Sequence, residues 1–279
     1  MSEDNEVISS LRRALKLLRI IAAGPPSGMR LKDIAHGAQC SQPTAHRVVQ
    51  DMIAEGFVER ATDAKRYRPA IDFFVLAARA GQVGGLRELA KPALLRLSAT
   101  LRDTVFLLVR DGYDAVCLDR ADGPFPIVSF TGDIGGKIPL GLGQGGMAIL
   151  AYLPPAEMRA VISFNMPRLL DCGFIDEAAL RTAIRKTQQD GWASMNTGLI
   201  PGMAGVGVPV LDAHGVVVAA LSIGTLAERL DEARTRDVAG ILNTEAAMLG
   251  SAINPFDSTL RRPSRSLSLI QDADQPHRC

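Results

Sequence analysis

Apolar residues recur at helical spacing in three segments near the N-terminus. The first segment predicts a helix from Ser10 to Ala23, stopped by a Gly-Pro-Pro sequence, with an apolar face of Leu11, Leu15, Leu18 and Ala22. A short second helix is expected over 31–37, where Gly37 would end it. The third helix begins at Ser41, a suitable N-cap, and runs to Glu55 just before Gly56. The pattern predicts a three-helix unit.

Short alternating segments follow the third helix. Residues 57–60 and 66–68 predict two strands of a small hairpin around a turn at 62–65, and Pro69 closes this unit. An apolar helix is expected from Ile71 to about Ala80, and the glycines at 81, 84 and 85 mark a junction. The first domain therefore spans 7–69, and a linker helix spans 70–85.

The pattern beyond the junction mixes helices with antiparallel strands, which indicates an α+β domain. Helices are expected at 86–100, 145–153, 155–163, 176–190 and 231–252, and strands at 104–109, 115–118, 191–195, 206–211 and 216–224. The sequence Asp111-Gly112 predicts a tight hairpin turn. We place this domain at 86–256, and the polar composition of 257–279 predicts a disordered tail.

Charge is distributed unevenly along the chain. The net charge is only +1, but residues 11–68 hold eleven Lys and Arg against five Asp and Glu, which favours a polyanionic partner for the first domain. The four cysteines (Cys40, Cys117, Cys172 and Cys279) are widely spaced, so neither a disulfide framework nor a zinc site is expected. No signal peptide or membrane-spanning segment is evident, and a cytoplasmic location is expected.

Two helices joined by a tight turn and followed by a hairpin have the layout of a winged helix-turn-helix, whose second helix enters the DNA major groove. The side chains suit that role, because Gln and Arg bond base edges while helix N-termini and Lys bind phosphates. The candidate DNA-binding residues are Ser41, Gln42, Thr44, His46 and Arg47 in the helix and Lys65, Arg66 and Arg68 in the wing. An adaptor that uses the same unit to bind a protein, without DNA, is the alternative.

Several stretches resemble the IclR family of bacterial transcriptional regulators. The sequence SQPTAHRVV at 41–49, with EGFV at 55–58, resembles that family's DNA-binding domain. The sequences KIPLGLGQGGMAILAYLP and DGWASMNTGLIPGMAGVGVPVLDAHGVVVAALSIG resemble its effector domain, so the similarity covers about residues 7 to 254. The resemblance implies a GAF-like sensor domain that binds a small organic effector, and assembly as a homodimer or homotetramer.

On this sequence the resemblance implies an effector site formed by a glycine-rich loop, a lid between Met195 and Gly205, and a strand. The candidate residues are Gly143, Gln144, Gly145, Met195, Met203, Gly205, Ser222 and Gly224. The loop matches GxGxxG, but the preceding apolar run is short and contains Pro139, and no acid follows about 20 residues on, so a dinucleotide site is rejected. A plain turn before a helix is the other explanation of these glycines.

The sequence departs from the family pattern in the expected pocket. Gly141 stands where many members have histidine, Met147 stands where they have lysine, and the lid at 196–205 carries no charge. These differences predict a partly apolar effector such as an aromatic or short aliphatic acid. No cofactor is expected. No nucleophile, base and orienting group come together in any catalytic motif, and the hairpin acids Asp111, Asp114 and Asp119 are expected to be surface carboxylates, so the chain is not expected to be an enzyme.

Overall fold

The computed structural model describes residues 9–61, 65–71, 73, 85–124, 127, 134–172, 176–194 and 200–253. The chain divides into two compact units between Val83 and Gly84. Most of the predicted linker helix, the predicted tail and the centre of the hairpin turn lie outside the described residues.

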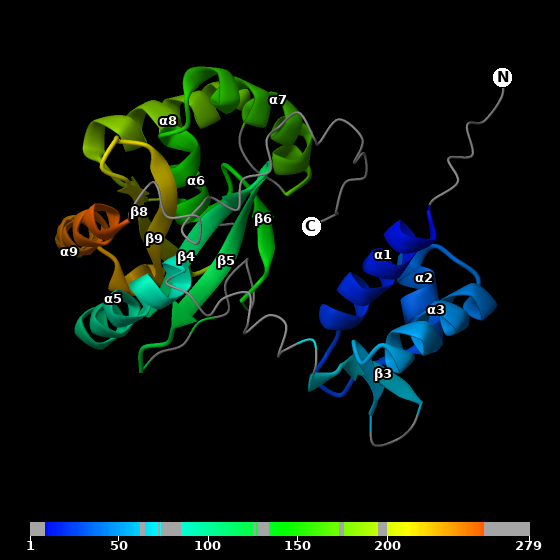
Figure 1. The fold of residues 1–279 in the computed structure, drawn as a ribbon. Coiled ribbons are helices and arrows are strands. Elements are labelled where there is room, and N and C mark those ends of the chain that lie inside the picture. Colours follow the sequence, from blue (N-terminus) through cyan, green and yellow to red (C-terminus); the bar gives the residue numbers. More distant parts are fainter. Residues whose placement is uncertain are drawn as a thin grey trace, which may run out of the picture. The chain divides into compact units, whose positions relative to one another are not determined.

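The first unit contains three helices and a small antiparallel sheet (Figure 1). In chain order these elements are α1 (Ser10–Ala22), β1 (Met29–Arg30), α2 (Leu31–Ala38), α3 (Gln42–Ala54), β2 (Val58–Arg60) and β3 (Arg66–Pro69), and the strand order is β1-β3-β2. The helices and the Tyr67 ring of β3 share one hydrophobic core. The winged helix-turn-helix prediction is confirmed, and β1 is an additional strand of two residues.

Of the four residues predicted to form the apolar face of α1, only Leu18 packs against the core. Leu17 and Ile21 are buried in the core, with Ala14 and Leu18 packed against it, whereas Leu11 is 68% exposed and Leu15 is 50% exposed. The helix carries more apolar residues than one face can hold, so the sequence offers two stripes at helical spacing. Packing against α2 and α3 buries one stripe and leaves the other at the surface.

Gly37 does not end α2. The helix continues to Ala38 and ends at Gln39, whose φ of 55° lies in the left-handed region and whose amide bonds the carbonyls of Ala35 and His36. Glutamine takes the position that glycine most often occupies after a helix. A Cβ on Gly37 would lie 3.5 Å from the Ile20 side chain, an ordinary contact distance, so the packing of α1 against α2 does not require glycine here.

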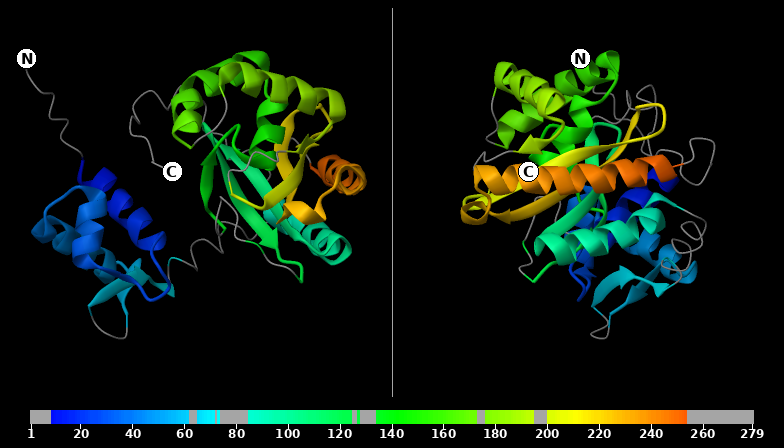
Figure 2. Two further views of the ribbon diagram at one scale, coloured as in Figure 1. Left: turned by 180° about the vertical axis from the view of Figure 1, so that it is seen from behind. Right: turned by 90° about the vertical axis from the view of Figure 1, so that its left-hand side faces the viewer.

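The second unit contains a six-stranded antiparallel sheet and helices on both of its faces, which confirms the α+β fold (Figures 1 and 2). The strand order is β6-β5-β4-β9-β8-β7. The elements in chain order are α5 (Leu86–Leu101), β4 (Thr104–Asp111), β5 (Asp114–Ala121), β6 (Lys137–Pro139), α6 (Gly143–Ala151), α7 (Pro155–Asp171), α8 (Glu177–Asp190), β7 (Ala193–Ser194), β8 (Met203–Leu211), β9 (Val217–Leu226), the 3₁₀ turn η1 (Ala227–Arg229) and α9 (Glu232–Ala252).

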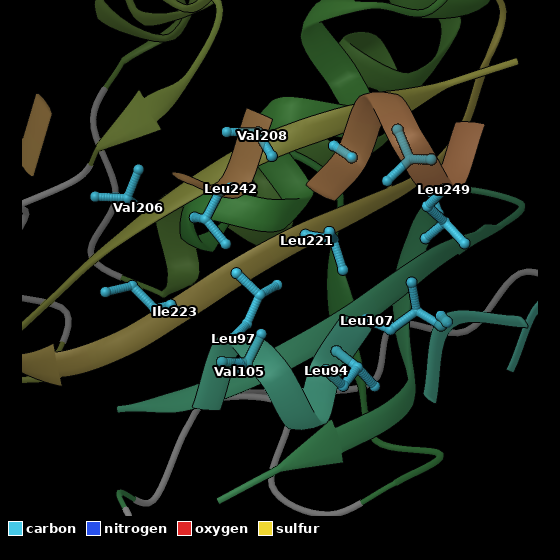
Figure 3. Packing of buried hydrophobic residues seen from close by; sticks show 14 of the residues in the cluster. Leu94, Leu97, Val105, Leu107, Val206, Val208, Leu221, Ile223, Leu242 and Leu249 are labelled. Atoms are coloured by element: carbon cyan, nitrogen blue, oxygen red, sulfur yellow. The ribbon is translucent and has the colours of Figure 1, made fainter. Parts of the chain in front are cut away.

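The sheet has two unlike faces. The α5–α9 face is covered by α5 and α9, and its strands contribute large aliphatic side chains that meet those of the helices; labelled examples are Leu94, Leu97, Val105, Leu107, Val206, Val208, Leu221, Ile223, Leu242 and Leu249 (Figure 3). The opposite α6 face is covered by α6, and α7 and α8 contact α6 (Figure 2). Its central strands carry Gly205, Gly207 and Ser222 beside Phe106 and Leu108.

Several elements of the second unit differ from expectation. The β4–β5 hairpin turns at Gly112-Tyr113 instead of Asp111-Gly112, because Asp111 and Asp114 still pair across the strands. Helix α7 extends to Asp171 through Pro167, eight residues beyond the expected end. Strand β6 was not anticipated, because only three of its residues pair with β5.

Asp119 is not a surface carboxylate. Its side chain is 1% exposed and forms ion pairs with Arg87 and Lys91 of α5, with N–O distances of 3.2 and 3.3 Å. A β-bulge causes this placement: Leu107 pairs with Asp119 while Leu108 pairs with Cys117, so Leu118 is an extra residue on β5. The bulge turns Asp119 toward α5.

The described cysteines differ in state. Cys40 and Cys117 are in the thiol form, whereas Cys172 is disulfide-bonded, which the sequence spacing did not indicate. None of the described helices combines the length and apolarity that a membrane span requires.

Candidate DNA-binding surface and effector site

Helix α3 has one buried and one exposed face. Ala45, Val48, Val49 and Met52 are buried in the core of the first unit, which fixes the rotation of the helix. On the other side Gln42, His46 and Arg47 are exposed, and Thr44 is half-buried. The predicted reading residues therefore occupy the first two turns of α3 on the side that packing leaves open.

The N-terminus of α3 is closed by two hydroxyl groups. The Ser41 hydroxyl accepts a hydrogen bond from the Thr44 amide at 3.3 Å, and the Ser41 and Thr44 hydroxyl oxygens lie 2.8 Å apart. Pro43 occupies the first turn, where its missing N–H costs no helical hydrogen bond. Ser41 is exposed, so this helix end presents polar groups to any phosphate that approaches it.

The three predicted wing residues have different surroundings. Lys65 is exposed at the start of the return strand. Arg66 is half-buried and its Nη1 donates to the Gly28 carbonyl at 3.0 Å, which joins the wing to the turn before β1. The Nε of Arg68 donates to Glu59 Oε1 at 2.6 Å across the hairpin.

Sequence reasoning missed one more cation at this surface. Arg60 on β2 is exposed, its guanidinium lies 5.9 Å from the centre of the Tyr67 ring, and its Nη2 donates to Gln50 Oε1 on α3 at 3.4 Å. The side chain therefore links the wing to the helix. The sequence could have identified Arg60 as a candidate, because it lies on the strand that directly follows α3.

The candidate effector site lies on the α6 face of the second unit. Strand pairing aligns residues from five strands in one row: Ala193, Gly207, Ser222, Phe106 and Arg120. The next row contains Gly205, Gly224 and Thr104. Residues in one row lie about 5 Å from their neighbours. The structure thus brings together Gly205, Ser222 and Gly224, three of the predicted residues.

The first turn of α6 rests directly on this surface. A Cβ on Gly207 would lie 2.6 Å from the Gln144 carbonyl carbon, and one on Gly145 would lie 2.0 Å from Leu108 Cδ1 and 3.1 Å from Ser222 Oγ. The glycines therefore permit close packing of the helix on the sheet. This packing places the start of α6, with Gly143, Gln144 and Gly145, next to Ser222.

The polar groups at this contact are few. Ser222 is 4% exposed, so its hydroxyl is a buried polar group on this face of the sheet. No side chain caps the N-terminus of α6. A buried donor beside uncapped helix amides is suited to an anionic ligand atom.

The remaining predicted effector residues lie at the margin or outside. Met203 is half-buried at the start of β8, two rows from Ser222. Met195 lies outside the described residues. Ile127, which sequence reasoning did not select, covers Gly224: a Cβ on Gly224 would lie 2.2 Å from Ile127 Cδ1. Among the described residues, no cluster of three or more His, Cys, Asp or Glu is arranged to hold a metal ion.

Comparisons with known proteins match both units to the same protein family. Residues 10–62 match the model of the IclR helix-turn-helix domain, and residues 79–250 match the model of the bacterial transcriptional regulator IclR C-terminal domain. The chain is 26% identical over 231 residues to the HTH-type transcriptional regulator XynR of Escherichia coli, covering 81% of this chain and 90% of the relative. It is 28% identical to the HTH-type transcriptional regulator BhcR of Paracoccus denitrificans, with 84% and 83% covered.

Solved structures show the same architecture. An IclR homolog from Microbacterium hydrocarbonoxydans, crystallised in complex with 4-hydroxybenzoate, superposes with a TM-score of 0.73 at 27% identity, covering 87% of this chain and 98% of that one. The Thermotoga maritima IclR structure superposes with a TM-score of 0.67 at 24% identity, covering 86% and 96%. The chain therefore belongs to the IclR family of bacterial transcriptional regulators, which bind DNA through the first domain and respond to a small molecule.

Proposed function

We propose that α3 is the recognition helix and that Arg47, His46 and Gln42 contact base edges in the major groove. The observation that carries this proposal is the exposure of these three side chains on a helix whose other face is buried. Arg and Gln make paired hydrogen bonds to guanine and adenine, respectively. Ser41, Thr44 and the first amides of α3 contact a phosphate and fix the register of the helix.

The wing contacts the DNA backbone in this proposal. Lys65 and Arg68 provide exposed positive charge, and Arg60 extends the charge toward α3. Arg66 supports the wing through its bond to the Gly28 carbonyl while its charge adds to the same surface. Contacts of this kind release counterions, so affinity falls steeply as the salt concentration rises.

The effector is a small, partly apolar acid bound on the α6 face. Its carboxylate lies at the first amides of α6 (Gly143, Gln144 and Gly145) and accepts a hydrogen bond from Ser222. Its apolar part lies near Phe106 and the Ile127 side chain that covers Gly224, and the sequence predicts that Met195 and Met203 add apolar contacts. The related Microbacterium protein was crystallised with an aromatic acid, 4-hydroxybenzoate, which supports this ligand class.

The regulator acts as a dimer on cytoplasmic DNA, and its effector domains pair further into a tetramer. The exposed stripe formed by Leu11 and Leu15 on α1 is an apolar surface that a second copy would cover. A two-fold dimer presents two α3 helices to a near-palindromic operator with half-sites one helical turn apart, or a multiple of it. Effector binding shifts operator affinity by a coupling of about 1–3 kcal/mol.

Fluorescence anisotropy with duplexes selected from a random pool by the wild-type protein tests the DNA surface. Arg47→Ala should weaken binding by about 1–3 kcal/mol and relax the preference at one base pair. The matched control is Arg236→Ala, which removes an exposed arginine of α9 in the other unit and should leave the affinity unchanged. Equal affinities for both variants and the wild type would remove Arg47 from the recognition surface.

A further inference from the structure

Gln50 on α3 carries a buried amide nitrogen that the fold does not use. The residue follows the buried Val49 and is itself half-buried. Its Nε2 atom is buried and, within the described part of the chain, has no hydrogen-bond partner. A buried donor without a partner costs free energy, so an apolar side chain of the same length would suit the packing of this helix better. Packing of α3 therefore does not explain a glutamine at this position.

The oxygen of the same amide contacts Arg60 of the wing. Arg60 Nη2 donates to Gln50 Oε1 at 3.4 Å, a long hydrogen bond that joins β2 to α3. The Arg60 guanidinium also lies 5.9 Å from the centre of the Tyr67 ring, within the range of cation–π contacts. Tyr67 is directly opposite Arg60 in the β2–β3 pairing and is buried in the core of the first unit. An acceptor on the helix and a ring fixed by the core thus restrict a long, exposed side chain.

The hydrogen bond to Gln50 places the Arg60 guanidinium beside the proposed base-reading residues. Residues three and four positions apart are neighbours on a helix surface, so Gln50 adjoins Arg47 and His46, which are both exposed. The guanidinium therefore lies about one turn further along the same side of α3. The positive charge of the wing is continuous here with the side of α3 that packing leaves open.

Most hydrogen-bond donors of Arg60 are available to a ligand. A guanidinium has five N–H donors, and among the described residues Arg60 has one acceptor, Gln50, and no carboxylate partner. Arg68 of the same hairpin differs, because it donates to Glu59 at 2.6 Å. An exposed guanidinium with no acidic partner suits a phosphate, which can accept two parallel N–H bonds from arginine.

We propose that Gln50 is a positioning residue for DNA binding, which holds Arg60 in the orientation in which its guanidinium contacts a backbone phosphate beside the recognition helix. An arginine that is ordered before DNA binds loses less side-chain entropy in the complex, so the contact adds more affinity. Gln50 acts through Arg60 and not through a base. The proposal rests on the DNA surface proposed above and adds to it a residue that only the folded contacts reveal.

Fluorescence anisotropy of full-length variants at several salt concentrations tests the proposal. Arg60→Gln should weaken binding to the selected duplex and to an unrelated duplex by the same factor, because a phosphate contact carries no sequence information. It should also reduce the slope of log affinity against log salt concentration by about 0.9. Gln50→Met keeps the length of the side chain and should weaken binding by about two- to tenfold. Its midpoint of urea unfolding should not fall, because the unsatisfied amide is removed.

A double-mutant cycle separates positioning from a purely structural role. In the Arg60→Gln background, Gln50→Met should cause no further loss of affinity. Arg236→Gln, on α9 in the other unit, is the control and should change neither affinity nor salt slope. Unchanged binding by Gln50→Met, an equal loss with and without Arg60, or a loss accompanied by a lower urea midpoint overturns the positioning role alone. An unchanged salt slope in Arg60→Gln overturns the phosphate contact, and if Arg47→Ala is also without effect, the DNA surface proposed above is wrong as well.

Discussion

The two faces of the six-stranded sheet carry opposite kinds of side chain. On the α5–α9 face, alternate residues of the central strands are Val, Leu and Ile, and they pack against two long helices. On the α6 face the same strands carry glycines and Ser222, and a short helix lies directly on the backbone. Large apolar side chains supply burial on one face, whereas small residues let a helix approach the backbone of the sheet on the other. The difference is consistent with a mainly stabilising α5–α9 face and with the effector site that we propose on the α6 face.

The largest loss of stability is expected for a substitution on the α5–α9 face. Leu221→Ala should lower the free energy of unfolding by about 2–5 kcal/mol, because it removes a fully buried side chain and leaves a cavity. Its neighbour on the other face provides the control: Ser222→Ala should change stability by less than about 1 kcal/mol. Equilibrium urea unfolding measures both. Comparable losses of unfolding free energy in Leu221→Ala and Ser222→Ala would show that both faces contribute equally to stability.

A smaller loss of stability is expected where the α6 helix touches the sheet. Gly207→Ala places a Cβ 2.6 Å from the Gln144 carbonyl carbon, which is backbone and cannot rotate away. The helix must shift, so we expect a loss of about 1–3 kcal/mol in urea unfolding, with weaker effector binding. If Gly207→Ala were as stable as the wild type, α6 would pack only loosely on the sheet.

The smallest effect on stability is expected at Gly224. The added methyl of Gly224→Ala meets the end of the Ile127 side chain, which can move aside, so stability should change by less than about 1 kcal/mol. The displaced side chain would enter the effector site, and calorimetry should show about tenfold weaker acid binding. Unchanged binding would place the effector away from Gly224.

Local signals predicted the limits of the proposed recognition helix well. Ser41, Pro43 and Gly56 mark the ends of α3 through the geometry of residues adjacent in sequence, and the structure confirms them. The prediction of the buried face of α1 failed because the helix has two apolar stripes. Only packing against α2 and α3 determines which stripe is buried. Elements whose ends depend on their own residues were therefore easier to predict than their contacts.

The proposed effector site depends on contacts between residues distant in sequence. Gln144 rests on Gly207 only because the register of the sheet brings β8 under α6. Arg120 was missed for a related reason: strict alternation from Cys117 would place Asp119 on the α6 face and Arg120 on the other. The extra residue Leu118 exchanges them, and no sequence pattern marks that bulge.

That exchange has a mechanical consequence. Asp119 binds Arg87 and Lys91 in the first turns of α5, the helix through which the chain enters the second unit, while Arg120 lies on the α6 face of the sheet. A single peptide bond joins the residue that contacts α5 to the residue on the opposite face. A displacement of the backbone at Arg120 would therefore be transmitted to the start of α5.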